Sequence, residues 1–488
     1  MNIRFFIRAA AGNIAFFLVL SVFSGCASAP KGPPPDTYYV RADGSDQNDG
    51  LSEETPFRSL FKAMAEASRT DIKTITLLSS LDLSSEQSSN SERVFIIQGT
   101  GKDLITIRGR DGEKTVLSGA GAGRRVILVK GISYICFENL EISGGSSAGE
   151  GGGLGVGVGS QVILGKGITI TGNRSETAGG GIAVASGGKL YIRGASVSGN
   201  SASGVGGGVA VSGADTVLVM EGGEIRENSA EGGGGVAVYE GGVFTLKDGA
   251  VSGNRAAIAG GGIVLNRGAA LTMEGGSITG NSSAGLGGAL ALIDNCAFTL
   301  LNGDIANNTS GEYGGGVAAD HTATLVLRGG NLRGNSAVLR GGGFFSSGAF
   351  FKAPESLCVI YGNDAPEGSA NSAQLGSAVY VSRDGYGDMI RERSAGAGTL
   401  LDSGRADGGW QNAGFSDAES GLNTEAEPLT ETGLSVDAEP DAETGPEPAW
   451  DAGAFGNTDG NETTNDEFSE DQFSQDQFSQ EAVDELSE

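Results

Sequence analysis

An acidic cluster near the N-terminus carries the side chains best suited to hold a metal ion. Asp43, Asp46, Asn48 and Asp49 lie close together in the chain, and carboxylate and amide oxygens are the ligands that Ca²⁺ prefers. Their spacing does not match an EF-hand loop, so a solvated turn is the alternative interpretation. We predict no resident metal or cofactor, with Asp43, Asp46 and Asp49 as the residues that would hold Ca²⁺ if it bound.

Two further groups have side chains suited to catalysis or ion binding. His321 is the only histidine and follows Asp320, so the pair is a candidate for acid–base or metal chemistry, with an ordinary turn as the alternative. Glu221, Asp248 and Glu274 recur at steps of 27 and 26 residues. They would bind a cation if they stacked at one turn, and dispersed surface charges are the alternative.

The first 25 residues are typical of an export signal. Two arginines precede an apolar stretch, and Ser24 and Gly25 directly precede Cys26, which is the order of a secretory signal. This ending resembles the lipobox of bacterial lipoproteins, although Phe23 replaces the usual leucine, as permissive lipoboxes allow. The resemblance implies that Cys26 is lipidated, while a plain signal peptide and an uncleaved anchor are alternatives. Residues 26–36 would form a flexible tether.

Negative charge is concentrated at the C-terminus. The chain has 488 residues and a net charge of −28, and residues 402–488 contain 24 Asp and Glu against one basic residue. Such a segment buries too little apolar surface to offset its chain entropy, so we predict disorder over residues 402–488. The regularly spaced Phe468, Phe473 and Phe478 are an alternative docking motif. The acidity argues against nucleic acid as a partner.

A 27-residue repeat occupies the centre of the chain. A glycine cluster returns at every step, at Gly181, Gly208, Gly235, Gly262, Ala289, Gly316 and Gly343. Three apolar columns keep the same step: Ile182, Val209, Val236, Ile263, Leu290, Val317 and Phe344; Leu190, Val217, Phe244, Leu271, Phe298 and Leu325; and Ile192, Val219, Leu246, Met273, Leu300 and Leu327. A further column shifts by one residue at a single place: Val197, Ile225, Val251, Ile278, Ile305 and Leu332.

Each repeat therefore holds three short apolar runs separated by glycine-containing turns. Runs this short cannot enclose a core alone, but stacked repeats bury continuous apolar columns. A propeller blade needs about 40 residues and four strands, so the shorter repeat favours a coil. The predicted fold is an all-β, right-handed parallel β-helix with three strand faces, the handedness following the general preference for right-handed crossovers.

One asparagine recurs in each repeat at steps of 26 to 28 residues: Asn173, Asn200, Asn228, Asn254, Asn281, Asn308 and Asn335, with Asn363 continuing the series. A carboxamide at a turn can donate to one coil and accept from the next, so we predict a structural ladder of stacked amides. The odd number of cysteines beyond Cys26, namely Cys136, Cys296 and Cys358, predicts packed free thiols. Cys136 and Cys296 would lie about six coils, roughly 29 Å, apart.

The repeat resembles a known group of bacterial surface proteins. The signatures "GGGI/V" and "SGN/TGN", with "YYVRADGSDQNDGLSEETPFRSL" at residues 38–60, are similar to those of right-handed β-helix repeat proteins. The repeat itself is similar to that of the polymorphic outer-membrane protein family, although the family's phenylalanine is replaced here. The resemblance spans residues 38 to about 380 and implies a surface role. Members carry a C-terminal β-barrel, which an anchor at Cys26 would replace.

The predicted organisation follows from these features. Residues 37–145 form an N-terminal cap and irregular coils, 146–345 the regular repeats, and 346–401 the C-terminal coils. Within the cap, Thr55 is the expected helix N-cap and Pro56 the first helical residue, with Phe57, Leu60, Phe61 and Met64 on the buried face. Such a helix would cover the open edge of the first coil.

The outer side of the first strand bears on enzyme activity. Its outward residues are expected to be Ala183, Ala210, Ala237, Val264, Ala291, Ala318 and Phe345, which include no acid, base or nucleophile. We therefore predict a non-catalytic, lipid-anchored surface protein that presents an adhesive or binding face to a host or matrix protein or a glycan, in the outer membrane at the cell surface. A carbohydrate-active enzyme is the alternative, because many right-handed β-helices cleave polysaccharides.

Overall fold

The computed structural model describes residues 36–85, 94–119, 123–347, 350–352, 356–362, 366–374, 377–381, 399–401 and 404–406. All of them belong to Asp36–Glu488, the larger of two units into which the chain divides. The predicted signal peptide, the lipidation site Cys26 and residues 26–35 of the tether lie outside the described residues. So does the tail, except for residues 404–406.

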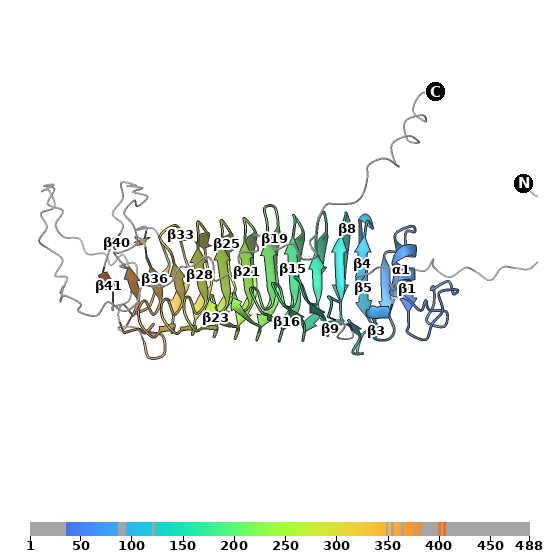
Figure 1. The fold of residues 1–488 in the computed structure, drawn as a ribbon, viewed down its shortest axis with the longest axis horizontal. Coiled ribbons are helices and arrows are strands. Elements are labelled where there is room, and N and C mark those ends of the chain that lie inside the picture. The colour runs from blue at the N-terminus through green and yellow to red at the C-terminus, as the bar shows by residue number, and fades with distance from the viewer. Residues whose placement is uncertain are drawn as a thin grey trace, which may run out of the picture. The chain divides into compact units, whose positions relative to one another are not determined.

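The described residues form a right-handed parallel β-helix whose coils stack in chain order (Figure 1). We call its three long sheets A, B and C. Sheet A contains β1 (Thr37–Val40), β2 (Thr74–Leu77), β3 (Leu81–Asp82), β5 (Gly101–Gly109), β6 (Val116–Ser118), β8 (Ser133–Glu138), β9 (Glu141–Ser143), β12 (Gln161–Leu164), β13 (Thr169–Thr171), β16 (Lys189–Ser198), β19 (Val217–Arg226), β22 (Val243–Ser252), β25 (Ala270–Met273), β26 (Ser277–Thr279), β29 (Ala297–Leu300), β30 (Asp304–Ala306), β33 (Thr324–Leu327), β34 (Asn331–Arg333) and β38 (Val359–Ile360).

Sheet B contains β4 (Phe95–Gln98), β7 (Ile127–Lys130), β11 (Leu154–Val156), β15 (Ile182–Ala185), β18 (Val209–Ser212), β21 (Val236–Tyr239), β24 (Ile263–Asn266), β28 (Leu290–Ile293), β32 (Val317–Ala319), β36 (Phe344–Ser346), β39 (Val379–Val381) and β41 (Gly404–Ala406). Sheet C contains β10 (Ser146–Ser147), β14 (Arg174–Ser175), β17 (Ser201–Ala202), β20 (Ser229–Gly232), β23 (Arg255–Ala259), β27 (Ser282–Ser283), β31 (Thr309–Ser310) and β35 (Ser336–Ala337). The remaining elements are α1 (Leu60–Ala67), the 3₁₀ turn η1 (Leu83–Ser85), and the antiparallel pair β37 (Phe350–Lys352) and β40 (Thr399–Leu401).

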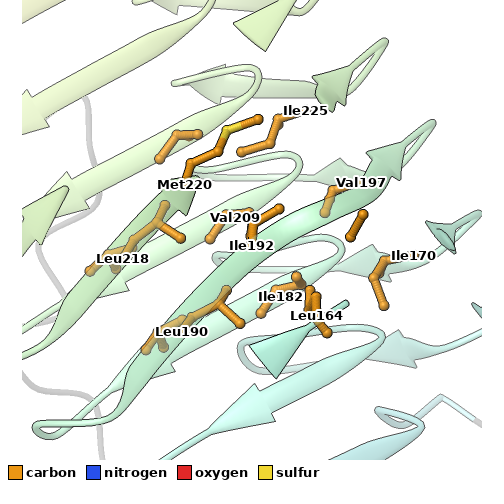
Figure 2. Packing of buried hydrophobic residues seen from close by; sticks show 14 of the residues in the cluster. Leu164, Ile170, Ile182, Leu190, Ile192, Val197, Val209, Leu218, Met220 and Ile225 are labelled. Atoms are coloured by element: carbon orange, nitrogen blue, oxygen red, sulfur yellow. The ribbon is translucent and has the colours of Figure 1, made fainter. Parts of the chain in front are cut away.

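Stacked apolar columns form the core, because each strand pairs with its counterpart one coil away. Ile263 in β24, for example, lies between Val236 and Leu290 and is completely buried. Figure 2 shows how side chains from sheets A and B meet between successive coils. The repeat therefore predicts most of the core, since a buried position recurs in every coil that keeps the 27-residue step.

Two predicted core residues are displaced by one position. Val217 and Val219 are only partly buried, whereas Leu218 and Met220 have no exposed surface. The register pairs Leu218 with Leu190 and Phe244, so the repeat is 28 residues long on one side of this strand and 26 on the other. One extra residue in the turn between Ser212 and Val217 causes the shift, and a bulge in the pairing of β20 with β23 removes it.

The three sheets do not correspond one to one to the three apolar runs predicted in each repeat. The second and third runs share sheet A, as in β16, where the strand bends at Gly194 with φ of 102°. Sheet C is built from two- to five-residue strands that follow the asparagines. The sequence did not reveal these strands, because they carry Ser, Ala and Arg rather than an apolar run.

Each glycine of the recurring triplet has its own structural task, illustrated by Gly260, Gly261 and Gly262. Gly260 has φ of 64°, a left-handed conformation that glycine adopts readily. A Cβ on Gly261 would meet backbone atoms of Ser282 and Gly288 well inside contact distance. At Gly262 the nearest backbone atom, the oxygen of Ala289, would be 2.8 Å away, and the equivalent position in the next coil is alanine.

We expect Gly261→Ala to lower the free energy of unfolding by about 2–3 kcal/mol, because its Cβ would force adjacent coils apart. Gly262→Ala should cost clearly less, as Ala289 already occupies the matching position. Urea unfolding followed by circular dichroism measures both variants. Equal losses would show that the middle glycine has no special close approach.

The asparagines form a continuous chain of hydrogen bonds. The carboxamide oxygen of Asn281 accepts from the backbone N–H of Asn254 (2.9 Å) and from its Nδ2 (2.9 Å). Its own Nδ2 donates to Asn308 Oδ1 (2.9 Å) and to the Val251 carbonyl (2.9 Å). The same pattern links Asn173, Asn200, Asn228, Asn254, Asn281, Asn308 and Asn335.

The expectation for the end of this ladder is wrong. Asn363 lies outside the described residues, and the residue that follows Asn335 is Asn371, whose Oδ1 accepts from Asn335 N (2.8 Å) and Nδ2 (3.0 Å). This step is 36 residues, because the last coil is longer than its neighbours. Constant spacing therefore fails where a coil contains an insertion.

The capping helix begins later than predicted. Ser59 is the N-cap of α1, and its hydroxyl accepts from Lys62 N (3.1 Å). Thr55 and Pro56 precede the helix, and Phe61 is 53% exposed. The buried face is Leu60, Ala63, Met64 and Ala67, which packs against β1 and β2. Leu60 and Met64 are thus buried as predicted, and Phe57 is buried although it precedes the helix. Of the predicted residues only Phe61 is exposed.

At the other end, β41 pairs antiparallel with β39, Val379 opposite Ala406. Gly404–Ala406 thus forms a strand inside the range 402–488 that was predicted to be disordered. Among the described residues, no helix has the length and apolar character needed to cross a membrane.

Candidate functional site

The outer face of sheet B is covered rather than exposed. The residues predicted to point outward do leave the main core, but Ala183, Ala210, Ala237, Val264, Ala291, Ala318 and Phe345 are all at most 2% exposed. A column of residues just before the glycine triplets lies against them and is linked by successive β-bridges: Ala178, Val205, Gly232, Ala259, Leu286, Tyr313 and Arg340. We call this the wall column, and the space between it and sheet B the outer groove.

Large side chains fill the C-terminal half of the outer groove. Leu286, Tyr313 and Phe345 belong to a second hydrophobic cluster, separate from the main core. The rings of Tyr313 and Phe345 lie 4.8 Å apart between centroids, and the Arg340 guanidinium lies 5.9 Å from the Tyr313 ring centre. In this half the side chains pack into a second hydrophobic cluster.

The N-terminal half of the groove contains a cavity of about 370 Å³. Here the wall column and sheet B carry small side chains, including Ala178, Val205 and Ala237, in place of Leu286, Tyr313 and Phe345. The lining is Glu150, Glu176, Thr177, Ala178, Ser203, Gly204, Val205, Ser212, Glu231, Ala237, Val238, Tyr239, Glu240, Val264, Asn266 and Arg267. A change in side-chain size along two columns thus opens a site in an otherwise packed groove.

Polar groups of the cavity come from distant coils. The Tyr239 hydroxyl donates to Glu150 Oε1 (3.1 Å), although the two residues are 89 positions apart. Arg267 Nη1 lies 3.3 Å from Glu240 Oε1. Asn266 is 6% exposed, and its carboxamide oxygen has no hydrogen-bond partner among the described residues. A buried acceptor without a donor is costly and marks a place where a ligand donor would be favourable.

Burial, reinforced by the nearby Glu150 carboxylate, raises the pKa of Tyr239 well above its usual value. We therefore expect one tyrosine to ionise late in an alkaline titration of tyrosinate absorbance, and Tyr239→Phe to remove that late step. The folded state favours the protonated phenol. The contribution of Tyr239 to the free energy of unfolding is therefore fully present below pH about 10, and it is lost as the pH rises through the folded pKa. An unchanged late step in Tyr239→Phe would contradict the assignment.

The acidic cluster considered for Ca²⁺ is engaged in local structure. Asp43 pairs with Arg41 (2.6 Å), and Asp46 accepts from the backbone N–H of Arg58 (3.0 Å) and of Ser59 (3.0 Å) at the start of α1. Asp49 accepts from Leu51 N (3.1 Å) and Thr55 Oγ1 (2.6 Å). Among the described residues, no group of three or more His, Cys, Asp or Glu side chains has an arrangement that could hold a metal.

Asp320 and His321 occupy different environments. Asp320 is buried, and its carboxylate accepts from Asp294 N (2.6 Å), Thr322 N (2.9 Å) and Thr322 Oγ1 (2.7 Å). His321 is exposed on the adjacent turn. The aspartate therefore ties two turns together, and it lies outside the cavity lining.

Of the three carboxylates considered for cation binding, Glu221 and Asp248 are opposite each other in adjacent coils. Among the described residues, however, no group of three such side chains has an arrangement that could hold a metal. Glu221 contacts Arg193 (2.8 Å) and Lys247 (3.3 Å). Asp248 accepts from Gly249 N (2.7 Å), and Glu274 is exposed on the next coil. The positive charges next to Glu221 are therefore the protein's own Arg193 and Lys247 side chains.

In the part of the chain that the structure describes, the cysteines are Cys136, Cys296 and Cys358, and all three are buried free thiols, as predicted. Burial raises the pKa of Cys136 to about 11, with Glu138 adding to the shift. Burial also raises the pKa of Cys296 to about 11. Both thiols are therefore poor nucleophiles at neutral pH.

No protein-family model matches the chain, and no curated protein sequence matches it. The proposed function therefore rests on the sequence and geometry of this molecule. A sequence signal for the cavity does exist: the wall column recurs at every 27th residue and changes from small to large side chains after Ala259. The column is not recognisable as a strand in the sequence, because isolated apolar residues in a glycine-rich segment do not resemble one.

Proposed function

We propose that this chain is an exported, lipid-anchored and non-catalytic binding protein that presents the cavity of the outer groove to a ligand. The observation that carries the proposal is the cavity. Protein interiors are close-packed, and the same groove is filled four coils further along, where the tilted rings of Tyr313 and Phe345 pack together. A space of about 370 Å³ with a few polar groups has the size of a small ligand site.

Charges on the outer side of sheet A support a non-catalytic role. Arg193 and Lys247 lower the pKa of Glu221, and Arg226 lowers the pKa of Glu224. Glycoside cleavage needs a carboxylic acid whose pKa is raised, so that it can protonate the leaving group. The pKa values of Glu221 and Glu224 are lowered instead. Both carboxylates are therefore better suited to ion pairs on the surface of sheet A.

Attachment to a membrane rests on the small-small-Cys ending of the export signal. A radiolabelled fatty acid should enter the wild-type protein in bacterial cells and not Cys26→Ser, which should leave the membrane fraction. Added protease should then degrade the anchored protein on intact cells. Complete protection would place it on the periplasmic side, and labelling of Cys26→Ser would exclude this anchor.

A binding screen tests the cavity. The mature wild-type protein and Val205→Tyr should be compared on arrays of glycans and matrix proteins. Tyrosine is tolerated at this column position in the native chain, at Tyr313, so the variant should fold and fill the cavity. We expect molecules on the arrays that bind the wild type to bind Val205→Tyr weakly or not at all. Equal binding by the variant, or release of reducing or unsaturated ends from a polysaccharide, would contradict a non-catalytic cavity site.

A further inference from the structure

We infer that the cavity takes the cationic side chain of a lysine or arginine from a basic peptide segment of a partner protein. This inference rests on the proposed binding function and names the chemistry of the ligand. It is carried by the charge of the lining, by its unused acceptor, and by the spacing of carboxylates along the rim.

The lining is strongly acidic. It contains four carboxylates, Glu150, Glu176, Glu231 and Glu240, and one guanidinium, Arg267. Because Arg267 is already paired with Glu240, the remaining carboxylates leave the site negative. A negative, partly enclosed site attracts cations and repels anionic glycans.

The interior combines methyl groups with hydrogen-bond acceptors. Ala178, Val205, Ala237 and Val264 give the cavity an apolar surface, against which the aliphatic stem of a long basic side chain can pack while its charged end meets carboxylates. Asn266 adds a buried carboxamide oxygen that lacks a donor. An ammonium or guanidinium group carries donors only, which complements a lining rich in acceptors.

Rim carboxylates favour a peptide over a free amine. Glu176 and Glu231 are both exposed, and the pairing of β14, β17 and β20 puts them two coils apart, on the order of 10 Å along the axis. An extended peptide spans this distance in about three residues. One basic side chain in the cavity and others at the rim would use all of these groups, whereas a single amine would use only the cavity.

Binding of a synthetic peptide to the full mature protein tests the inference. The probe is a fluorescent peptide of alternating Arg and Ser, and the matched peptides replace each Arg with Glu or with Gln. We expect the Arg peptide to bind in a salt-dependent manner and the Glu and Gln peptides to bind far more weakly. The acidic tail also attracts basic peptides, but its contribution is common to all variants, so differences between variants isolate the cavity.

Three variants divide the contributions. Val205→Tyr should weaken binding of the Arg peptide at least about tenfold, by filling the cavity. The double variant Glu176→Gln and Glu231→Gln should weaken it roughly 3–10-fold. Glu274→Gln, which changes an exposed carboxylate between β25 and β26 that is outside the lining, should leave binding of the Arg peptide unchanged. Val205→Leu, which copies Leu286, serves as a milder filling variant if the tyrosine perturbs the fold.

The outcomes are distinguishable. Equal binding of the Arg and Gln peptides would overturn the inference. So would an Arg peptide whose binding is unchanged in both Val205→Tyr and Val205→Leu. If a ligand from the array lost binding in Val205→Tyr while the Arg peptide did not, the cavity would be a binding site for another chemistry. If no ligand responded to Val205→Tyr, the proposed function would fail as well.

Discussion

Asn281→Leu should lower the free energy of unfolding by roughly 3–5 kcal/mol, because each buried polar group left without a partner costs about 1–3 kcal/mol. Asn281 has no exposed surface. Leucine would remove the acceptor of Asn254 N and Asn254 Nδ2, and the donor to the Val251 carbonyl. Urea unfolding monitored by circular dichroism measures the loss.

Two comparisons make this result specific. Asn302→Ala changes an exposed asparagine outside the ladder and should cost less than about 0.5 kcal/mol. Asn281→Asp preserves shape and acceptors but turns the donor toward Asn308 Oδ1 into an acceptor, so it should also be strongly destabilising. A ladder variant as stable as Asn302→Ala would show that the amide bonds contribute little.

Ile263→Asp should be at least as damaging, with a loss of roughly 3–5 kcal/mol or failure to fold. The side chain lies in the core between Val236 and Leu290, where a carboxylate has no partner, and an uncompensated buried charge costs about this much. Thr272→Asp is the matched control, because Thr272 is partly exposed in β25, and its loss should stay below about 1 kcal/mol. Thermal melts of both variants give the comparison.

The pH dependence of Ile263→Asp provides a second readout. Burial disfavours the charged form, so the pKa of the introduced carboxyl is expected to be higher in the folded state than in the unfolded state. The variant should then be most stable below the unfolded pKa of about 4 and lose stability as the pH rises toward neutral. A loss that did not change with pH, or equal melts of the two variants, would mean that Ile263 does not face the core.

Register shows where prediction from the sequence succeeds and where it fails. The column containing Ile263 is correct, since every member of it is completely buried. The column containing Phe244 is correct for Phe244 itself and fails at Val217. A constant step predicts Val217 in the core, yet Leu218 takes that position. Successive side chains of a strand point to opposite faces, so one extra turn residue moves the predicted core residues to the outer face. The offset persists until a bulge restores the 27-residue step.

The wall column shows a different limit. A first-strand residue such as Ala237 points away from the main core, as its alternation with Val236 and Val238 predicts, but this does not make it exposed. Gly233 has φ of 59°, and a Cβ there would meet the backbone of Val236, so the chain turns tightly just before β21. Wall-column residues such as Ala259 share one hydrophobic cluster with Ala237. Whether an outward residue meets water therefore depends on the path of the connecting segment, which alternation does not describe.

The sequence by itself determined the coil, its 27-residue step, the apolar columns and the position of one asparagine per turn, because a stacked fold repeats every local requirement once per coil. Only the tertiary structure decided the cavity, since Glu150 and Tyr239 lie 89 residues apart and meet through their reach across several coils. Local patterns determine what each coil must bury. A site built from several coils depends on which side chains leave space between them. This space is defined only when the coils are stacked in the folded molecule.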